Sequence, residues 1–229
     1  MLRNRHMTIA LLALAAVVAC DDDDDDFTGL DGTASVRVAN ATGGNIDVAS
    51  GTTVATADAN VGFGGASSCL ITHVINSDVG VSPTGTTNSF ASFAPDFRGG
   101  EHYVAVAYPG FAGATEFAYI PSGAAMATGQ AGLRVFNAAA SAGSYDVYVS
   151  APGAALGTAS ATGIAFRTVS SYIPVAASTS QVRLTTAGTQ TVTINAGNLN
   201  FTAGQNAVLV IAPPATGTTT FRTFLVTGC

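Results

Sequence analysis

The segment QVRLTTAGTQTVTIN (181–195) contains two short stretches in which apolar and polar residues alternate, separated by a turn-like TAGTQ. Val182 and Leu184 occupy the apolar positions of the first stretch, and Val192 and Ile194 those of the second. A period of two with β-branched residues is typical of strands that bury one face. The segment therefore predicts two antiparallel strands, each with its apolar side chains in a core.

The rest of the chain after residue 27 shows the same pattern of short strand-like stretches separated by turns. Short apolar or alternating stretches are separated by Gly, Pro, Asn or Ser clusters, and no stretch keeps apolar spacings of three and four over the length of a helix. Further strand candidates are CLITHVI (69–75), EHYVAVAY (101–108), AVLVIA (207–212) and FRTFLV (221–226). The sequence predicts an all-β protein.

The chain also repeats itself, with the matches in the same order and an offset that grows from 97 to 104 residues or slightly more. The matching pairs are VRVANA (36–41) with LRVFNA (133–138), IDVAS (46–50) with YDVYVS (145–150), FGGASSCLITHV (63–74) with FRTVSSYIPV (166–175), FRGGEHYVAVAYPG (97–110) with FTAGQNAVLVIAPP (201–214), and TEFAYI (115–120) with TFRTFL (220–225). An ordered set of this kind predicts a tandem duplication.

Each repeat spans 90 to 100 residues with about seven expected strands, which suits an immunoglobulin-like sandwich of two sheets over a shared core. We expect two tandem immunoglobulin-like antiparallel β-sandwich repeats, at residues 34–121 and 132–229, joined by a linker at 122–131. One closed barrel made from all the strands is the alternative.

The second repeat resembles a known family. LRVFNA, YDVYVSAPGAAL, AFRTVSSYIPVAAS, QVRLTTAGTQTVTI and LNFTAGQNAVLVI, all within residues 131–227, are similar to the bacterial domain of unknown function 4397. The first repeat is more divergent, since its DVYV is reduced to DVAS and Cys69 replaces the aromatic residue of SSY. The resemblance implies two copies of a β-sandwich domain in an exported, surface-attached bacterial protein, and it implies no catalytic residue.

Residues 1–19 have the layout of a secretory signal peptide, with two arginines followed by a short apolar run and small residues. The run is too short for a membrane-spanning helix, which needs about 20 apolar residues. VVAC (17–20) resembles the lipobox of bacterial lipoproteins, in which the cysteine becomes the acylated N-terminus. We therefore expect Cys20 to carry lipid and to hold the protein on a membrane, with the outer membrane favoured and a periplasmic or surface-facing display.

The six aspartates at 21–26 follow this cysteine directly. A run of like charges stays extended and solvated, so we expect residues 20–33 to form a tether between the lipid and the folded part. A calcium site is the alternative, but the run lacks the spaced ligands and the glycine of a calcium loop.

The chain has a formal net charge of −6, and most of it belongs to the tether. Residues 27–229 hold eight acidic residues against six arginines, and the chain has no lysine. A nucleic-acid-binding surface needs clustered cations that neutralise phosphates, so this class of partner is excluded.

The folded part shows few residues that suggest catalysis or metal binding, and we expect no cofactor and no enzyme activity. His73 and His102 lie in different expected strands, and Cys69 lies four residues before His73, too far along a strand to share a metal. Asp47 and Asp146 recur at matching repeat positions, which favours a structural role such as a turn or strand-end hydrogen bond. Tyrosines such as Tyr108, Tyr119 and Tyr148 could offer sugar-stacking surfaces, since tryptophan is absent.

Cys69 and Cys229 remain once Cys20 is lipidated. Export would place them in an oxidising compartment, where a remaining pair tends to form a disulfide. The alternative is that Cys69 is a small buried apolar residue and Cys229 a free thiol.

Two functions from different classes fit these features. The favoured one is a non-enzymatic envelope module for binding, adhesion or scaffolding, with an envelope protein or polysaccharide as ligand and with recognition by loops at the ends of the sandwiches. The alternative is an exported hydrolase acting on polysaccharide or protein. A deep pocket with converging polar groups would favour the hydrolase.

Overall fold

The structure is a computed structural model that describes residues 32–50, 56–74, 79–86, 91–93 and 97–229. These residues form β-strands and one short 3-10 turn, η1 (Phe111–Gly113), with no α-helix among them. The first half contains β1 (Thr33–Asn40), β2 (Ile46–Ser50), β3 (Thr56–Val61), β4 (Leu70–His73), β5 (Val79–Pro83), β6 (Ala91–Phe93), β7 (His102–Pro109) and β8 (Thr115–Pro121). The second half contains β9 (Gln130–Asn137), β10 (Tyr145–Ser150), β11 (Ala161–Ile164), β12 (Ile173–Ala176), β13 (Thr179–Thr186), β14 (Val192–Asn200), β15 (Asn206–Ala212) and β16 (Arg222–Thr227).

Within the described residues the strands form four sheets of four strands each, and each sheet takes its strands from one half of the chain. The first half has the sheets β3-β2-β5-β6 and β4-β1-β7-β8, and the second half has β11-β10-β13-β14 and β12-β9-β15-β16. Adding eight to every label of the first half gives the strand orders of the second. The predicted all-β class with two tandem sandwiches is confirmed, and a single closed barrel is not what forms.

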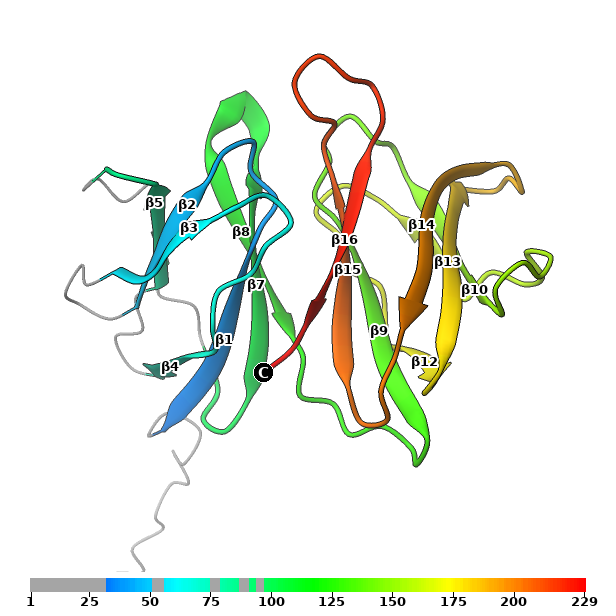
Figure 1. Cartoon of the computed structure of the whole chain (residues 1–229), viewed down its shortest axis with the longest axis horizontal. Helices are drawn as coiled ribbons and strands as arrows, with labels where there is room; N and C mark the ends of the chain where they lie inside the picture. The colour runs from blue at the N-terminus through cyan, green and yellow to red at the C-terminus, as the bar shows by residue number, and fades with distance from the viewer. Residues whose placement is uncertain (1–31, 51–55, 75–78, 87–90, 94–96) are drawn as a thin grey trace, which may run out of the picture.

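The four sheets are stacked in layers (Figure 1). The sheets that contain β7 and β15 lie in the middle and face each other, while those that contain β2 and β13 lie on the outside. We call the two halves the first unit and the second unit, and the two middle layers the inner sheets.

Each inner sheet has one parallel pair, so the prediction of purely antiparallel sandwiches is wrong for these pairs. β1 runs parallel to β7, and β9 runs parallel to β15, whereas the other pairs are antiparallel. Parallel neighbours need a crossover connection, and here the chain passes through the opposite sheet of the sandwich between the two strands.

The outer sheet of the second unit shows how far the alternation holds. Val182, Leu184 and Ile194 are buried, as the alternation predicts. The expectation for Val192 is wrong, because this side chain is 41% exposed. The pairing of β13 with β14 shifts register between Leu184 and Thr185, and such a bulge changes the face on which the following residue lies.

The side chains that the structure describes form three hydrophobic cores between the four layers. One fills each sandwich, and the third lies between the two inner sheets. The buried members of this third core, which we call the junction core, are Ala39, Ala41, Val104, Val106, Tyr108, Ile120, Phe136, Ala138, Val208, Val210, Ala212 and Val226. The central strands β7 and β15 therefore bury both faces, and β7 is buried at every position from Tyr103 to Tyr108, whereas the edge strands β4 and β12 alternate buried and exposed residues.

The predicted boundaries at 34–121, 122–131 and 132–229 can be compared with the ends of the strands and with the junction core. β8 ends at Pro121 and β9 begins at Gln130, so the connection lies where the linker is expected. Independent folding of the two units stays a prediction, and an isolated unit would expose an apolar sheet face.

The N-terminal features lie outside the described residues. These are the expected signal peptide at 1–19, the lipid attachment at Cys20 and the acidic tether as far as residue 31. In the part of the chain that the structure describes, no helix has the length and apolar character that a membrane crossing requires.

Candidate functional site

The junction between the units is built from reciprocal contacts. Arg37 on β1 donates from Nη1 to the carbonyl oxygen and the Oγ1 of Thr227, at 3.1 and 2.7 Å. Its counterpart Arg134 on β9 donates from Nη1 to the carbonyl oxygen of Pro121, at 3.3 Å. Thr227 and Pro121 end the last strand of each unit and pair with equivalent positions of β15 and β7. The two units thus face each other across an approximate twofold axis, as the subunits of a homodimer do.

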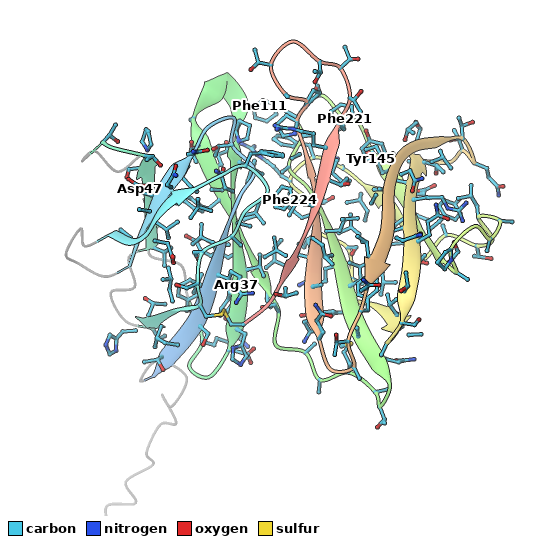
Figure 2. The ribbon with its side chains drawn as sticks, viewed as in Figure 1. Arg37, Asp47, Phe111, Tyr145, Phe221 and Phe224 are labelled. Carbon is cyan, nitrogen blue, oxygen red and sulfur yellow. A yellow bond between two sulfur atoms is a disulfide. The ribbon has the colours of Figure 1, made fainter. Side chains whose placement is uncertain are left out.

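The Cys69–Cys229 disulfide closes one side of this junction. The structure joins the two residues with their Cα atoms 5.8 Å apart, within the range that a disulfide needs. Arg37 Nη2 also lies 3.1 Å from the Cys69 sulfur, and Figure 2 shows this side chain beside the bridge. On the opposite side of the axis Tyr172 takes the place of Cys69, and its hydroxyl donates to the carbonyl oxygen of Pro121 at 2.7 Å. A covalent bond on one side therefore matches a hydrogen bond on the other.

A group of aromatic and charged side chains extends the junction toward the other end of the units. Arg167 forms an ion pair with Glu116, which also accepts a hydrogen bond from the Tyr108 hydroxyl at 3.0 Å. Arg222, at the strand position equivalent to Glu116, contacts the first unit instead through a ring, since its guanidinium lies 3.2 Å from the centre of the Phe63 ring. Burial and the hydrogen bond to Glu116 raise the pKa of Tyr108 to about 12. These polar groups are engaged with one another across the junction.

Asp47 and Asp146 hold turns, and the structural role predicted for them is confirmed. Asp47 accepts from the amides of Asn60 and Gly85 at 2.7 and 3.1 Å, and these bonds lower the pKa of its carboxyl. Asp146 accepts from the amides of Gly163 and Gly188 at 2.8 and 2.7 Å. All four amide donors have positive φ, and each carboxylate fixes one turn, at Gly85 or Gly188, and one irregular position of an edge strand, at Asn60 or Gly163.

Two further pairs of buried polar residues recur in the units, and the sequence analysis did not single them out. Asn40 and Asn137 each donate from Nδ2 to two carbonyl oxygens, and each accepts an amide two residues further on. Ser67 and Ser170 accept from the amides of β1 and β9 at 2.9 Å. The signal was present, because these residues stand inside the repeated VRVANA, LRVFNA and Ser-Ser motifs.

The shared topology and the shared polar contacts describe one domain design used twice. Residues 131–227 match the family described as Domain of unknown function (DUF4397). The match covers the second unit from β9 to the end of β16. No curated protein matches the chain. The DUF4397 match supports the resemblance for the second unit.

The histidines lie apart from any cluster of metal ligands. His73 ends β4 and His102 begins β7. Within the described ranges, no group of three or more His, Cys, Asp or Glu side chains is placed to hold a metal ion. Neither histidine therefore marks a metal centre in this part of the chain.

The proposed sugar-stacking tyrosines are mostly inaccessible. The suggestion is wrong for Tyr108 and Tyr148, which are buried, and Tyr119 is half-buried against the Phe97 ring. Tyr108 fills the junction core, which could not be known from its residue type. In the described ranges an exposed aromatic side chain is found instead at Phe111, 62% exposed, in the connection between β7 and β8.

A small cavity of about 300 Å³ lies at the junction beside Cys229. His102, Ser122 and Asn206 line it together with glycines and the Gln205 side chain. Ser122 Oγ and His102 Nδ1 have no hydrogen-bond partner among the described residues, so they do not form the nucleophile–base pair that acyl transfer needs. No contact in the described part of the chain favours the hydrolase over the binding module.

Proposed function

We propose that this chain is a lipid-anchored cell-envelope protein that works without catalysis, by binding, adhesion or scaffolding. The N-terminal pattern supports export and acylation of Cys20. The ligand class in this proposal is an envelope protein or a polysaccharide, and the outer membrane is the favoured location, with a periplasmic or surface-facing display. The first unit, residues 34–121, is proposed as a second, divergent copy of the DUF4397 domain.

The disulfide is the observation that carries the proposal. Disulfides form and persist in oxidising compartments such as the periplasm and the cell surface, and are rare in the cytosol. This one joins the first unit to the last residue of the chain, 160 positions away. Together with the junction core it holds both units in one orientation, which suits a module that presents a fixed surface.

The direction of the strands indicates which end would face outward. β1 begins at Thr33, at the lower end of the view in Figure 1, directly after the expected tether. The connections between β7 and β8 and between β15 and β16 lie at the upper end. The exposed Phe111 lies in this region (Figure 2), with the Arg167 guanidinium 4.6 Å from its ring centre. In the proposal these distal loops carry the recognition surface.

The test of the anchor is the Cys20→Ala variant, followed by detergent phase separation of the membrane fraction. The chain without substitutions is expected in the detergent phase, because each buried methylene of an acyl chain contributes about 0.8 kcal/mol to membrane binding. The variant is expected in the aqueous phase. The Cys69→Ser/Cys229→Ser double variant is the matched control and should stay with the detergent. A Cys20→Ala protein that still enters the detergent phase would contradict the proposal.

A further inference from the structure

The second unit has a cavity on the open side of its sandwich, between the edge strands β11 and β12. Its volume is about 420 Å³, which falls in the range of small-molecule pockets, roughly 300–1,000 Å³. Hydroxyl-bearing residues dominate the lining, and no charged side chain is among them. They include Ser160, Thr162, Thr168, Ser171 and Tyr172.

The first unit closes the equivalent position with its own carboxylate. Asp58 on β3 accepts from the amide and the hydroxyl of Ser68, at 2.9 and 2.6 Å. These bonds tie the edge strand of the outer sheet to the segment that leads into β4. Two donors from one residue on one carboxylate oxygen make a charge-assisted contact, which is stronger than a neutral hydrogen bond.

Strand register shows which residues of the second unit correspond to these two. Asp58 lies opposite Val48 on β2, and Ala161 lies opposite Val147 at the same place on β10. Ser171 corresponds to Ser68, because each follows the buried serine that accepts the amide of β9 or β1. The second unit therefore keeps the donor residue and replaces the carboxylate with a methyl group.

The two donors of Ser171, its hydroxyl and its backbone amide, have no partner among the described residues. Its side chain is exposed, and neither its hydroxyl nor its amide has a protein acceptor in the described residues. A positive charge lies behind it, since Arg134 donates from Nε to the carbonyl oxygen of Ser170 at 3.0 Å. The same guanidinium lies 5.0 Å from the ring centre of Tyr172, which lines the cavity. The site thus combines unpaired donors with a nearby cation and no acidic side chain in its lining. The neighbouring Asp146 carboxylate is already engaged by the amides of Gly163 and Gly188.

We infer that this cavity binds a small carboxylate ligand, whose carboxylate takes the place that Asp58 occupies in the first unit. The ligand is a sugar acid or an acylated amino acid, whose other polar groups meet the surrounding hydroxyls. The inference deepens the proposed binding role by naming a ligand class. It does not depend on the lipid anchor, so the Cys20 experiment and this one can fail separately.

The test is a calorimetric titration of the purified full chain at constant ionic strength. Glucuronate and N-acetylglycine are the two carboxylate probes, and glucose is the neutral comparison. We expect one of the acids to bind and glucose to bind at least about tenfold more weakly, because a hydrogen bond to a charged group is stronger than one to a neutral group. Which acid binds more tightly distinguishes the sugar source from the amino-acid source.

The Ala161→Asp variant rebuilds the internal carboxylate of the first unit and should fold, since that unit already accommodates it. We expect it to weaken binding of the carboxylate at least tenfold, and Ser171→Ala to weaken it to a similar degree. Ser68→Ala, at the equivalent position of the first unit, is the matched control and should leave the affinity unchanged. The inference is overturned if neither acid binds, if glucose binds as tightly as the acids, or if both second-unit variants keep the original affinity.

Discussion

The Cys229→Ser variant is expected to lose about 5 kcal/mol of unfolding free energy relative to the oxidised chain. The bond closes a loop of 160 residues, and in the chain-entropy model a loop of that length restricts the unfolded state by this amount. Urea denaturation without reductant measures the loss. The substitution changes the last residue of the chain and removes no member of the three cores, so the effect reports the cross-link.

Reduction of the Cys69–Cys229 disulfide in the chain without substitutions is the matched control for this prediction. It should lower the stability to that of the variant, and should leave the Cys69→Ser/Cys229→Ser double variant unchanged. A count of free thiols on the denatured, unreduced protein gives an independent check. Reactive thiols at both Cys69 and Cys229, together with a variant as stable as the parent, would contradict the cross-link.

The second large effect is expected at the junction core. Phe136 is 1% exposed, and its ring contacts Tyr108 of the first unit with the ring centres 5.4 Å apart. Phe136→Ala should cost about 3–5 kcal/mol, because it removes buried apolar surface and leaves a cavity. Since Phe136 belongs to the junction core, which the two units share, amide hydrogen exchange should become faster in the inner sheets of both units.

Ile71→Ala is the control for the junction variant. The Ile71 side chain on β4 is 62% exposed and belongs to none of the three cores, so its loss should change the stability by no more than about 0.5 kcal/mol. If Phe136→Ala destabilises the second unit while the amides of β1 and β7 exchange as before, then the junction core does not couple the units.

The strands and their repetition could be predicted because their signals are local. Alternation at Val182 and Leu184 reports a half-buried strand, and the ordered matches report the duplication. Alternation fails at Val192, because a bulge changes the sheet face on which a side chain lies without changing the pattern of apolar and polar residues.

The junction was missed although the sequence carried a signal for it. The runs YVAVAY (103–108) and AVLVIA (207–212) are continuously apolar rather than alternating. Strands buried on both faces have this composition, as in sheets covered on both sides. The runs predict strands, and nothing local shows that the covering layer is the other unit. The burial of Tyr108 follows from the same contact.

The cavity of the second unit could not be predicted because it depends on a difference between the repeats. Asp58 and Ala161 fall in a part of the chain that the repeat matches skip. Strand register aligns them, and that register comes from the pairing of β3 with β2 and of β11 with β10 in three dimensions. The cysteine pair was different, since export and residue count suggested it while the Cα distance needed the structure.

The most direct test of the central claim is to cut the chain between the units and then reduce it. A protease site inserted between Ala127 and Thr128, both exposed, would allow cleavage of the connection. If the two units share a core, the fragments should elute together by gel filtration after cleavage and full reduction, at the volume of the intact chain. Two folded fragments that elute separately once the disulfide is reduced would show that the units are independent domains joined by the bridge alone.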